Sequence, residues 1–303
     1  MNTKQWAAFL GLSIAWGTSF AWIKIAVQEI GPVTMLAIRL LLGSLFLLAV
    51  AAFQKPAWPK SRQEWVVLAV IGITNTAVPF VLISWGQQYI DSTVSSILSG
   101  SVPLFVAILA HYFLKDDRLS LGRFVGVLVG FGGVVVLIGQ GTAAGGGLGM
   151  QAQLAVLLAM VFYAFSAVYT RLKAHDISPV IQSLVPLIVA DGLLWLLVPF
   201  TEMPFQLPEQ LNTWGAILWL AVISSGIAYL LYYYLLHSIG PTRTLLVTYM
   251  FPLIGVISGA VFLGEQINLR MITGGALVLF SVLIVNNSLG NLWHWFKARR
   301  QPI

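Results

Sequence analysis

The chain has 303 residues, of which 58% are hydrophobic and 9% are charged, and its mean hydropathy is +0.89. A soluble domain carries about 25% charged residues, so this composition excludes an ordinary soluble protein, whose polar side chains must cover its core. Disulfides, thiolate metal sites and thiol catalysis are also excluded, because the chain contains no cysteine. The four histidines form no zinc-binding pair on a helix, and we expect no cofactor.

Ten apolar segments follow one another along the chain, and each has about the 20 residues that a helix needs to cross a bilayer. Turn signals such as Gly31-Pro32 and Gly240-Pro241 separate them. The sequence therefore predicts an all-α membrane protein with ten transmembrane helices. The predicted spans are residues 6–27, 32–53, 64–86, 91–113, 120–139, 150–171, 179–200, 212–237, 242–263 and 268–289.

The 16 Lys and Arg side chains are divided unevenly between the two sets of connections that alternate along the chain. One set holds 13 of them, the other set holds only Arg270, and Lys24 and Arg39 lie inside spans. Because basic loops stay on the cytoplasmic side, we expect a multi-pass protein of the inner (plasma) membrane with both termini in the cytoplasm. The 13 residues are Lys4, Lys55, Lys60, Arg62, Lys115, Arg118, Arg123, Arg171, Lys173, Arg243, Lys297, Arg299 and Arg300.

One residue pattern occurs twice in the chain, at a fixed offset of 149 residues. Internal repeats of this size in a membrane chain indicate a transporter. Each half contains five spans, an odd number, so the second half enters the membrane in the opposite direction and the halves are inverted repeats. The recurring pairs include Pro103 and Pro252, Phe113 and Phe262, Leu114 and Leu263, and Gly126 and Gly275.

The repeat divides the chain into four parts. We expect a first five-helix repeat at residues 1–139, a Gly-rich linker at 140–149, a second five-helix repeat at 150–290 and a basic cytoplasmic tail at 291–303. The linker lacks the Lys and Ser or Thr that end a P-loop, so it predicts no nucleotide site. The tail is expected to contact anionic membrane lipid, and nucleic acid is not an expected partner.

Motifs in four of the spans are typical of one transporter family. Trp16-Gly17-Thr18-Ser19-Phe20 precedes Lys24 in the first span and Arg39 in the second, and Pro252 precedes Leu263-Gly264-Glu265 and Gly275. With these residues the chain resembles the EamA-type branch of the drug/metabolite transporter superfamily over nearly its whole length. The resemblance implies a ten-helix inverted-repeat carrier, commonly an exporter of amino acids or related small metabolites. The first half has Leu114-Lys115-Asp116 instead of Leu-Gly-Glu, so we expect this tripeptide to set a turn between helices.

Polar residues on one face of the fourth span, and their repeat mates in the ninth, are candidates for the wall of a substrate cavity. In both spans hydroxyl side chains spaced by four residues lead to a proline, which leaves a backbone carbonyl unpaired. A small polar solute can bind such groups, whereas the alternative is that small residues only let the helices pack closely. The residues are Ser95, Ser99 and Pro103, with the mates Thr244, Thr248 and Pro252.

Six further uncharged residues are candidates for substrate contact because they lie deep in their spans and beside other polar positions. An amide inside the membrane needs a partner, so it binds substrate or ties helices together. Aromatic belts at the lipid interface explain many of the other aromatic residues. The six candidates are Trp16, Ser19, Asn75, Tyr163, Ser224 and Tyr249.

Charged residues inside spans are functional candidates by default, because they are costly in a membrane. Asp191 lies near the middle of the seventh span and is a candidate site for a coupling proton; the alternative is that it faces water or pairs structurally. Lys24 and Arg39 lie toward the outer ends of their spans, where long side chains extend to the interface or attract a substrate carboxylate.

These features favour a secondary transporter that exports small amphiphilic metabolites by alternating access. A membrane-embedded enzyme is the first alternative, but the spans lack the clustered carboxylates, histidines or nucleophile that it needs. A receptor or scaffold does not need matched inverted halves. The glycine series Gly122, Gly126 and Gly130 predicts close helix packing inside the chain rather than a dimer contact, so we expect a monomer or a weak homodimer.

Overall fold

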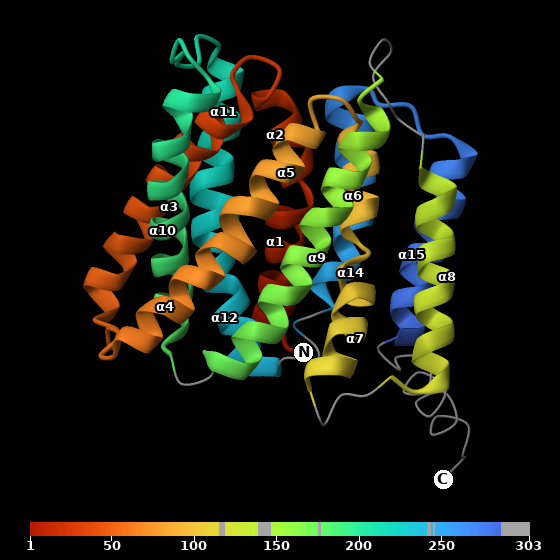
Figure 1. The fold of residues 1–303 in the computed structure, drawn as a ribbon, viewed down its shortest axis with the longest axis horizontal. Helices are drawn as coiled ribbons and strands as arrows, with labels where there is room; N and C mark the ends of the chain where they lie inside the picture. Colours follow the sequence, from red (N-terminus) through yellow and green to blue (C-terminus); the bar gives the residue numbers. More distant parts are fainter. Residues whose placement is uncertain (115–118, 139–146, 175–176, 241–243, 245, 286–303) are drawn as a thin grey trace.

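The structure is a computed structural model that describes residues 1–114, 119–138, 147–174, 177–240, 244 and 246–285, and within these residues the chain forms ten helical spans (Figure 1). The first half contains α1 (Thr3–Gly17) with α2 (Ser19–Ala26), α3 (Pro32–Gln54), α4 (Arg62–Ile71) with η1 (Gly72–Ala77) and α5 (Val78–Gly86), α6 (Ser92–Ser99) with α7 (Val102–Phe113), and α8 (Leu121–Leu137). The second half contains α9 (Gly149–Lys173), α10 (Pro179–Thr201), α11 (Leu211–Leu218) with η2 (Trp219–Ile227) and α12 (Ala228–Ile239), α14 (Val247–Leu263) and α15 (Leu269–Val285).

The lengths of the spans agree with the predicted membrane architecture. Within the described residues, seven spans have at least 18 residues and are apolar enough to cross a membrane by length and composition. The other three spans, α8, α14 and α15, are apolar helices of 17 residues each, at the lower limit for a transmembrane helix.

The predicted boundaries differ from the structure by a few residues. Helix α9 begins at Gly149, the last residue of the predicted linker, so the second repeat starts one residue earlier than predicted. The prediction places the ninth span at residues 242–263; α14 covers Val247–Leu263, and the predicted start lies partly outside the described residues. Residues 139–146 of the predicted linker region, residues 241–243 and 245, and the predicted tail at 291–303 lie outside the described part of the chain.

Two spans contain a π-helix at matching places in the repeat. η1 covers residues 72–77, and η2 covers residues 219–227, which include residues 221–226 at the repeat offset of 149. Turns of π-helix are rare inside α-helices and occur frequently at functional sites. The inverted repeat therefore extends to an irregular backbone feature in the third and eighth spans.

The first and fourth spans are interrupted, whereas α9 and the described helix α14 are continuous at the positions that match these breaks. In the first span, the hydroxyl groups of Thr18 and Ser19 donate to carbonyls four residues back, at 2.7 and 2.9 Å, and such bonds bend helices. In the fourth span, Pro103 has no N–H to donate, and the N–H groups of Gly100 and Ser101 bond to carbonyls three residues back.

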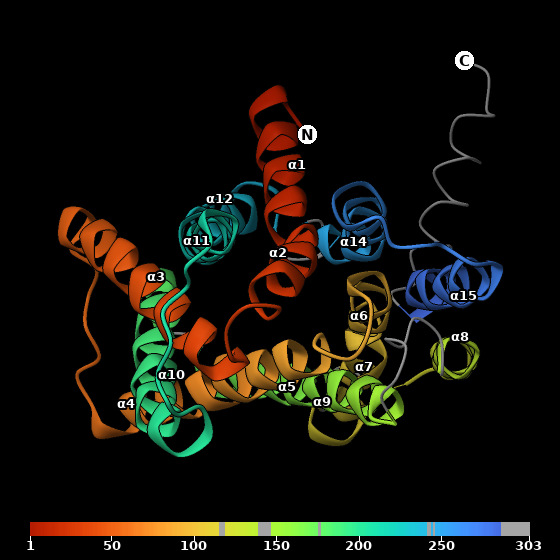
Figure 2. The ribbon, with the colours of Figure 1, turned by 90° about the horizontal axis from the view of Figure 1, so that it is seen from above.

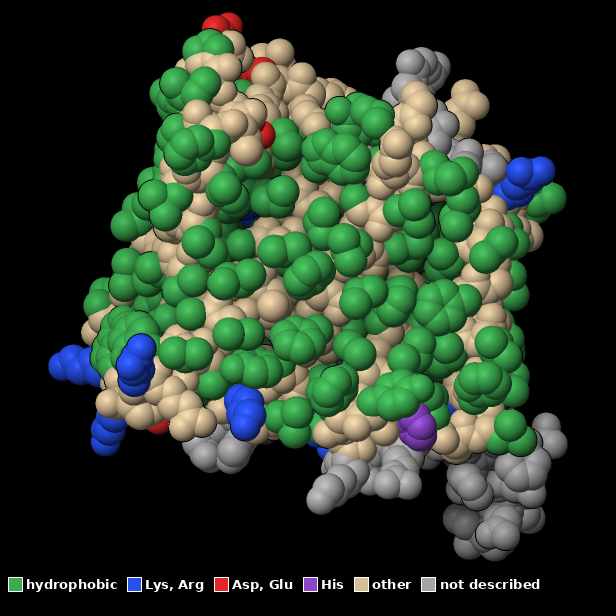
Figure 3. All heavy atoms as spheres, viewed as in Figure 1, with side chains coloured by type: hydrophobic (Ala, Val, Ile, Leu, Met, Phe, Trp, Pro, Cys, Tyr) green, Lys and Arg blue, Asp and Glu red, His purple; other side chains and the backbone are tan. Residues whose placement is uncertain are grey.

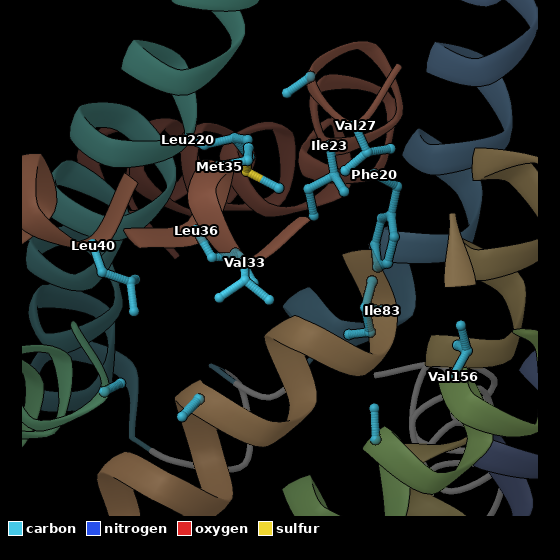
Figure 4. Close-up of a cluster of buried hydrophobic side chains, with 14 of the residues drawn as sticks. Phe20, Ile23, Val27, Val33, Met35, Leu36, Leu40, Ile83, Val156 and Leu220 are labelled. Atoms are coloured by element: carbon cyan, nitrogen blue, oxygen red, sulfur yellow. The ribbon is translucent and has the colours of Figure 1, made fainter. Parts of the chain in front are cut away.

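The main apolar core contains buried side chains of the first, second, third and sixth spans, and it extends to the fourth, fifth, seventh, eighth and tenth spans. Figure 4 shows Phe20 and Ile23 of α2, Leu36 of α3, Ile83 of α5 and Val156 of α9 as members of this core, and all are buried. Because residues from both halves belong to it, the core holds the two repeats together.

Glycines let α8 pack closely against α15 at one end of the molecule (Figures 1 and 2). A Cβ atom on Gly133 would lie 2.7 Å from the carbonyl oxygen of Gly274, and one on Gly126 would lie 3.0 Å from Ile284. A Cβ on Gly130 would meet the Leu104 side chain. Two members of the predicted glycine series thus pack inside the chain, and the oligomeric state stays a prediction.

Charged side chains lie at two opposite edges of the molecule, with an apolar band between them (Figure 3). We call the edge that holds the N-terminus the basic edge, and the opposite edge, which holds Glu29, Glu202, Glu265 and Arg270, the acidic edge. This separation matches the uneven division of basic residues in the sequence. The helix ends and the α3–α4 connection that lie at the basic edge in Figure 1 carry the described basic residues Lys4, Lys55, Lys60, Arg62, Arg123, Arg171 and Lys173.

Candidate functional site

Ser224 of η2 joins the first span to the eighth span across the boundary between the halves. The Nε1–H of Trp16 donates to the Ser224 carbonyl at 3.0 Å, and the hydroxyl of Ser19 donates to the hydroxyl of Ser224 at 3.0 Å. The Ser224 hydroxyl in turn donates to the Ala15 carbonyl at 2.7 Å. The π-helix and the interrupted first span therefore meet in one hydrogen-bonded group.

Arg39 of α3 lies beside the next residue of the same π-helix. Its Nε and Nη2 donate to the hydroxyl oxygen of Ser225 at 3.3 and 3.2 Å, and its guanidinium lies 4.5 Å from the centre of the Phe80 ring. Tyr163 and Tyr229, from the second half, are close enough to interact electrostatically with the guanidinium. Arg39 thus stands among aromatic rings from both repeats.

The burial of Arg39 corrects one of the two predicted alternatives. Only 5% of the residue is exposed, so the side chain does not extend to the membrane interface. The reason is geometric, because α3 packs against α10 and η2 and the guanidinium points to Ser225 on η2. Within the described residues, Ser225 is the only hydrogen-bond acceptor of Arg39 and no carboxylate pairs with it.

Trp16 extends the aromatic surroundings of the site. Its ring lies 6.0 Å from the Tyr229 ring, 5.7 Å from the Tyr232 ring and 5.8 Å from the Phe251 ring, measured between centroids. The contacts with Tyr229 and Phe251 are edge-to-face and the contact with Tyr232 is tilted; such contacts fix ring positions and present apolar surface. The site therefore combines one cation, two serine hydroxyls and several aromatic rings.

The structure brings five of the predicted candidates together at this place. They are Trp16, Ser19, Arg39, Tyr163 and Ser224. The prediction missed Ser225, Phe80 and Tyr229. Ser225 directly follows the predicted candidate Ser224, so the sequence could have indicated it. Tyr229 belongs to a group of tyrosines that covers all sides of a helix, so its sequence position does not distinguish it. Phe80 carries no sequence signal.

The hydroxyl stripe of the fourth span lies in a different region, where α6 packs against α14. Ser95 is fully buried and its hydroxyl has no hydrogen-bond partner, and the Ser99 hydroxyl donates to the Ser95 carbonyl at 2.8 Å. Beside them, a Cβ on Gly100 would lie 2.8 Å from Pro252. Close packing is therefore part of the role of this region, and its contact with a substrate stays a prediction.

The other uncharged candidates are spread over further elements. The Thr244 hydroxyl donates to the Gly240 carbonyl at 2.8 Å, and the Tyr249 hydroxyl donates to the Val282 carbonyl at 3.4 Å. Thr248 is partly buried on α14, Pro103 is the second residue of α7, and the half-buried Asn75 side chain lies on η1. None of these residues joins the Arg39 group through a hydrogen bond that the structure shows, and their substrate contacts stay predictions.

Lys24 and Asp191 occupy separate positions. The Lys24 ammonium donates to the carbonyls of Gln87 and Ile90 at 2.7 and 2.9 Å, which ties α2 to the end of the third span. Asp191 of α10 is 8% exposed, and its Oδ1 has no hydrogen-bond partner. The Lys24 ammonium is thus hydrogen-bonded to backbone carbonyls, whereas the Asp191 carboxylate has one oxygen without a hydrogen-bond partner inside the bundle.

Three carboxylates at the acidic edge cap helices of the opposite half. Glu202 accepts from the N–H groups of Val33 and Thr34 at 2.8 and 2.7 Å. Carboxylates are favourable at a helix N-terminus, because they pair unsatisfied N–H groups and the positive end of the helix dipole. Glu202 belongs to the second half and caps α3 of the first half, so the contact joins the repeats.

Glu265 and Glu29 form the other two caps. Glu265 accepts from the N–H groups of Ser92 and Thr93, at 2.7 and 2.8 Å, at the start of α6. Glu29 accepts from Glu209 and Gln210, at 2.5 and 2.9 Å, ahead of α11. We call Glu29, Glu202 and Glu265 the carboxylate clasp.

The predicted turn role of Leu263-Gly264-Glu265 is therefore only part of what this tripeptide does. Gly264 has a φ of 65°, a left-handed conformation that suits glycine and ends α14. Glu265 then reaches α6. Burial raises the pKa of the neighbouring Asp91 carboxyl, and Glu265 raises it further, while the nearby Lys24 lowers it.

Two hollows open between the halves, one at each edge. The acidic-edge hollow has a volume of about 750 Å³, and the basic-edge hollow has a volume of about 650 Å³. The first is lined by residues that include Trp22, Gln28, Asn212 and Phe262, and the second by residues that include Gln54, Ser178, Tyr234 and Ser238. In each hollow both halves contribute to the wall.

Ten apolar spans in two inverted halves, with polar groups buried between the halves, define a multi-pass membrane protein of the inverted-repeat carrier class. The sequence profile of the EamA-like transporter family matches residues 5–139 and 150–287, once in each half. The chain belongs to the EamA-like transporter family, which is part of the drug/metabolite transporter superfamily. The predicted family and fold class are thereby confirmed, and membership of a transporter family confirms that the chain is not an enzyme.

Relatives from all three domains of life match nearly the whole chain. An uncharacterized transporter of Archaeoglobus fulgidus is 26% identical over 93% of this chain and 98% of its own length. The uncharacterized transporter YoaV of Bacillus subtilis is 20% identical over 93% and 96%. The chloroplastic WAT1-related protein At3g02690 of Arabidopsis thaliana is 24% identical over 95% and 70%.

A solved crystal structure has the same fold. It superposes with a TM-score of 0.66, covers 92% of this chain and 98% of its own, and is 18% identical in sequence. At this identity the likeness shows the fold alone.

Proposed function

We propose that this membrane transporter is a secondary carrier that exports small amphiphilic metabolites, such as amino acids, across the inner membrane by alternating access. The observation that carries the proposal is the group of Trp16, Arg39, Ser224 and Ser225, which both halves build inside the apolar bundle. Carriers with inverted repeats place their substrate sites near the midplane at such a boundary.

Two further observations support alternating access. The hollows at the acidic and basic edges both lie between the halves, so a rocking motion of one half against the other widens one hollow while it narrows the other. The basic edge fits the cytoplasmic side, because basic loops stay there, and this supports our proposal that both termini are cytoplasmic.

Asp191 is the candidate for a coupling proton. Its buried carboxylate with an unpaired oxygen is the kind of intramembrane group that serves in proton relays. Exchange of a proton at this residue would drive solute outward against its gradient.

Solute efflux from proteoliposomes tests the proposed function. Purified protein is reconstituted, and the liposomes are loaded in turn with amino acids and with cationic drugs under imposed solute and proton gradients. We expect protein-dependent efflux of at least one amphiphilic solute, above that of empty liposomes. If no solute moves under any gradient, the proposed function is wrong.

A further inference from the structure

Arg39 is a buried cation without an anionic partner, and a membrane interior makes this arrangement costly. The residue is 5% exposed, and within the described part of the chain its only hydrogen-bond acceptor is a neutral hydroxyl. An unpaired charge in a span is expensive and marks an ion or substrate position. Lys24, the other candidate cation inside a span, donates hydrogen bonds to two backbone carbonyls. Arg39 differs from it, because its acceptor is a single hydroxyl.

The hydrogen-bond geometry leaves one side of the guanidinium available. The group carries five N–H donors in a planar fork. The edge with Nε and Nη2 faces the Ser225 hydroxyl, and within the described residues no acceptor pairs with the edge formed by Nη1 and Nη2, which is the edge that a ligand would use. Two parallel N–H groups on such an edge match the two oxygens of a carboxylate.

The charge balance and the neighbours narrow the ligand class. One guanidinium neutralises one negative charge, so a carboxylate leaves no net charge at the site, whereas a doubly charged phosphate does. Phe80 lies 4.5 Å from the guanidinium, and Trp16 packs against Tyr229 and Phe251 nearby. These rings offer apolar surface for the remainder of the ligand.

Building on the proposed transport function, we propose that Arg39 binds the carboxylate of the transported solute and that the substrates are amphiphilic monocarboxylates. Arg39 belongs to the first half and its partner Ser225 to the second. A carboxylate bound there contacts the boundary along which the halves move, which links occupancy to the position of the halves.

Ligand binding to the purified full-length protein tests this inference separately from transport. The probes are amino acids, 3-phenylpropionate and benzoate, each paired with its own amide, and binding is measured from intrinsic fluorescence and from the thermal unfolding midpoint. We expect at least one carboxylate to bind about 10- to 100-fold more tightly than its amide, as the loss of a charge-assisted hydrogen bond predicts.

Variants of Arg39 assign the preference to this residue. Arg39→Gln should remove the preference for the carboxylate, and Arg39→Lys, which keeps the charge but not the fork, should bind the carboxylate with intermediate affinity. Arg270→Gln, which removes one exposed positive charge at the acidic edge, should behave as the unmodified protein. If Arg39→Gln does not fold, Arg39→Lys and Ser225→Ala carry the comparison.

Three results would overturn the inference. These are the absence of binding by every carboxylate probe, equal binding of carboxylates and amides, or unchanged carboxylate affinity in folded Arg39 variants. The two proposals fail differently. Carboxylate binding that depends on Arg39, without solute movement in liposomes, contradicts the transport function and supports the anion site.

Discussion

Asp191 differs from the other acidic residues that the structure places, because it lies near the middle of a span with one oxygen unpaired. If it carries the coupling proton, Asp191→Asn fixes the residue in an uncharged state and removes the response to a proton gradient. We expect efflux by Asp191→Asn to vary at least about tenfold less with the imposed proton gradient than efflux by the unmodified protein. The reason is that a pH difference of one unit corresponds to a factor of ten in the driving equilibrium. Glu209→Gln, at an exposed position, is the control. An identical pH profile for Asp191→Asn removes Asp191 from the mechanism.

The hydroxyl residues of α6 and α14 test the choice between cavity wall and packing. We expect Ser99→Leu and Thr248→Leu to block transport while the protein stays folded in the membrane. Ser96→Leu is the matched control for a packing defect. Ser96 already fills the space beside Gly255, so a leucine there should lower stability by about 1–3 kcal/mol through overpacking. Transport rates and unfolding midpoints are measured together. Full transport by both test variants assigns these hydroxyls to packing.

At the scale of elements, the carboxylate clasp is the main polar link between the halves at the acidic edge. Glu202→Gln and Glu265→Gln each remove the charge and one of two accepted N–H bonds. A helix cap contributes about 0.5–2 kcal/mol, so each variant should lower the unfolding midpoint by a few degrees. Arg270→Gln, at the same edge but outside the clasp, should leave it unchanged. Midpoints equal to that of the unmodified protein in both clasp variants would show that these caps do not hold the edge together.

The sequence predicts elements much better than it predicts the contacts between them. The spans follow from local hydrophobicity, and the repeat follows from the fixed offset that pairs Pro103 with Pro252. The clasp joins Glu202 to Val33, 169 positions away, and no local period specifies such a pair. The π-helices were also missed, because one inserted turn does not change the apolar character of a span.

The candidate site shows the same division. Trp16, Arg39 and Ser224 were predicted because each is polar or charged at depth, where an unpaired group is costly. Phe80 was missed since a phenylalanine in an apolar span has no distinguishing signal, and only the packing of α5 on α3 brings it to the guanidinium. The burial of Arg39 was also not predictable, because its depth in the span does not reveal which helix faces it.

At the scale of the whole molecule, the two halves share a fold but not every detail. The first and fourth spans are interrupted, and α9 and the described helix α14 are continuous at the matching positions. In an inverted-repeat carrier the halves exchange conformations during the cycle, so under the proposed alternating access we expect such differences to distinguish the two sides. The clasp joins the halves at the acidic edge, and we expect these contacts to separate if a solute leaves on that side.

The distances across the two edges test alternating access most directly. The chain has no cysteine, so spin labels can be attached to Gln28→Cys with Asn212→Cys at the acidic edge, and to Gln54→Cys with Ser238→Cys at the basic edge. All four positions are exposed and line the two hollows. In lipid nanodiscs, we predict that conditions which lengthen the distance across one edge shorten the distance across the other. Unchanged distances at both edges, in labelled protein that still transports solute, would contradict alternating access.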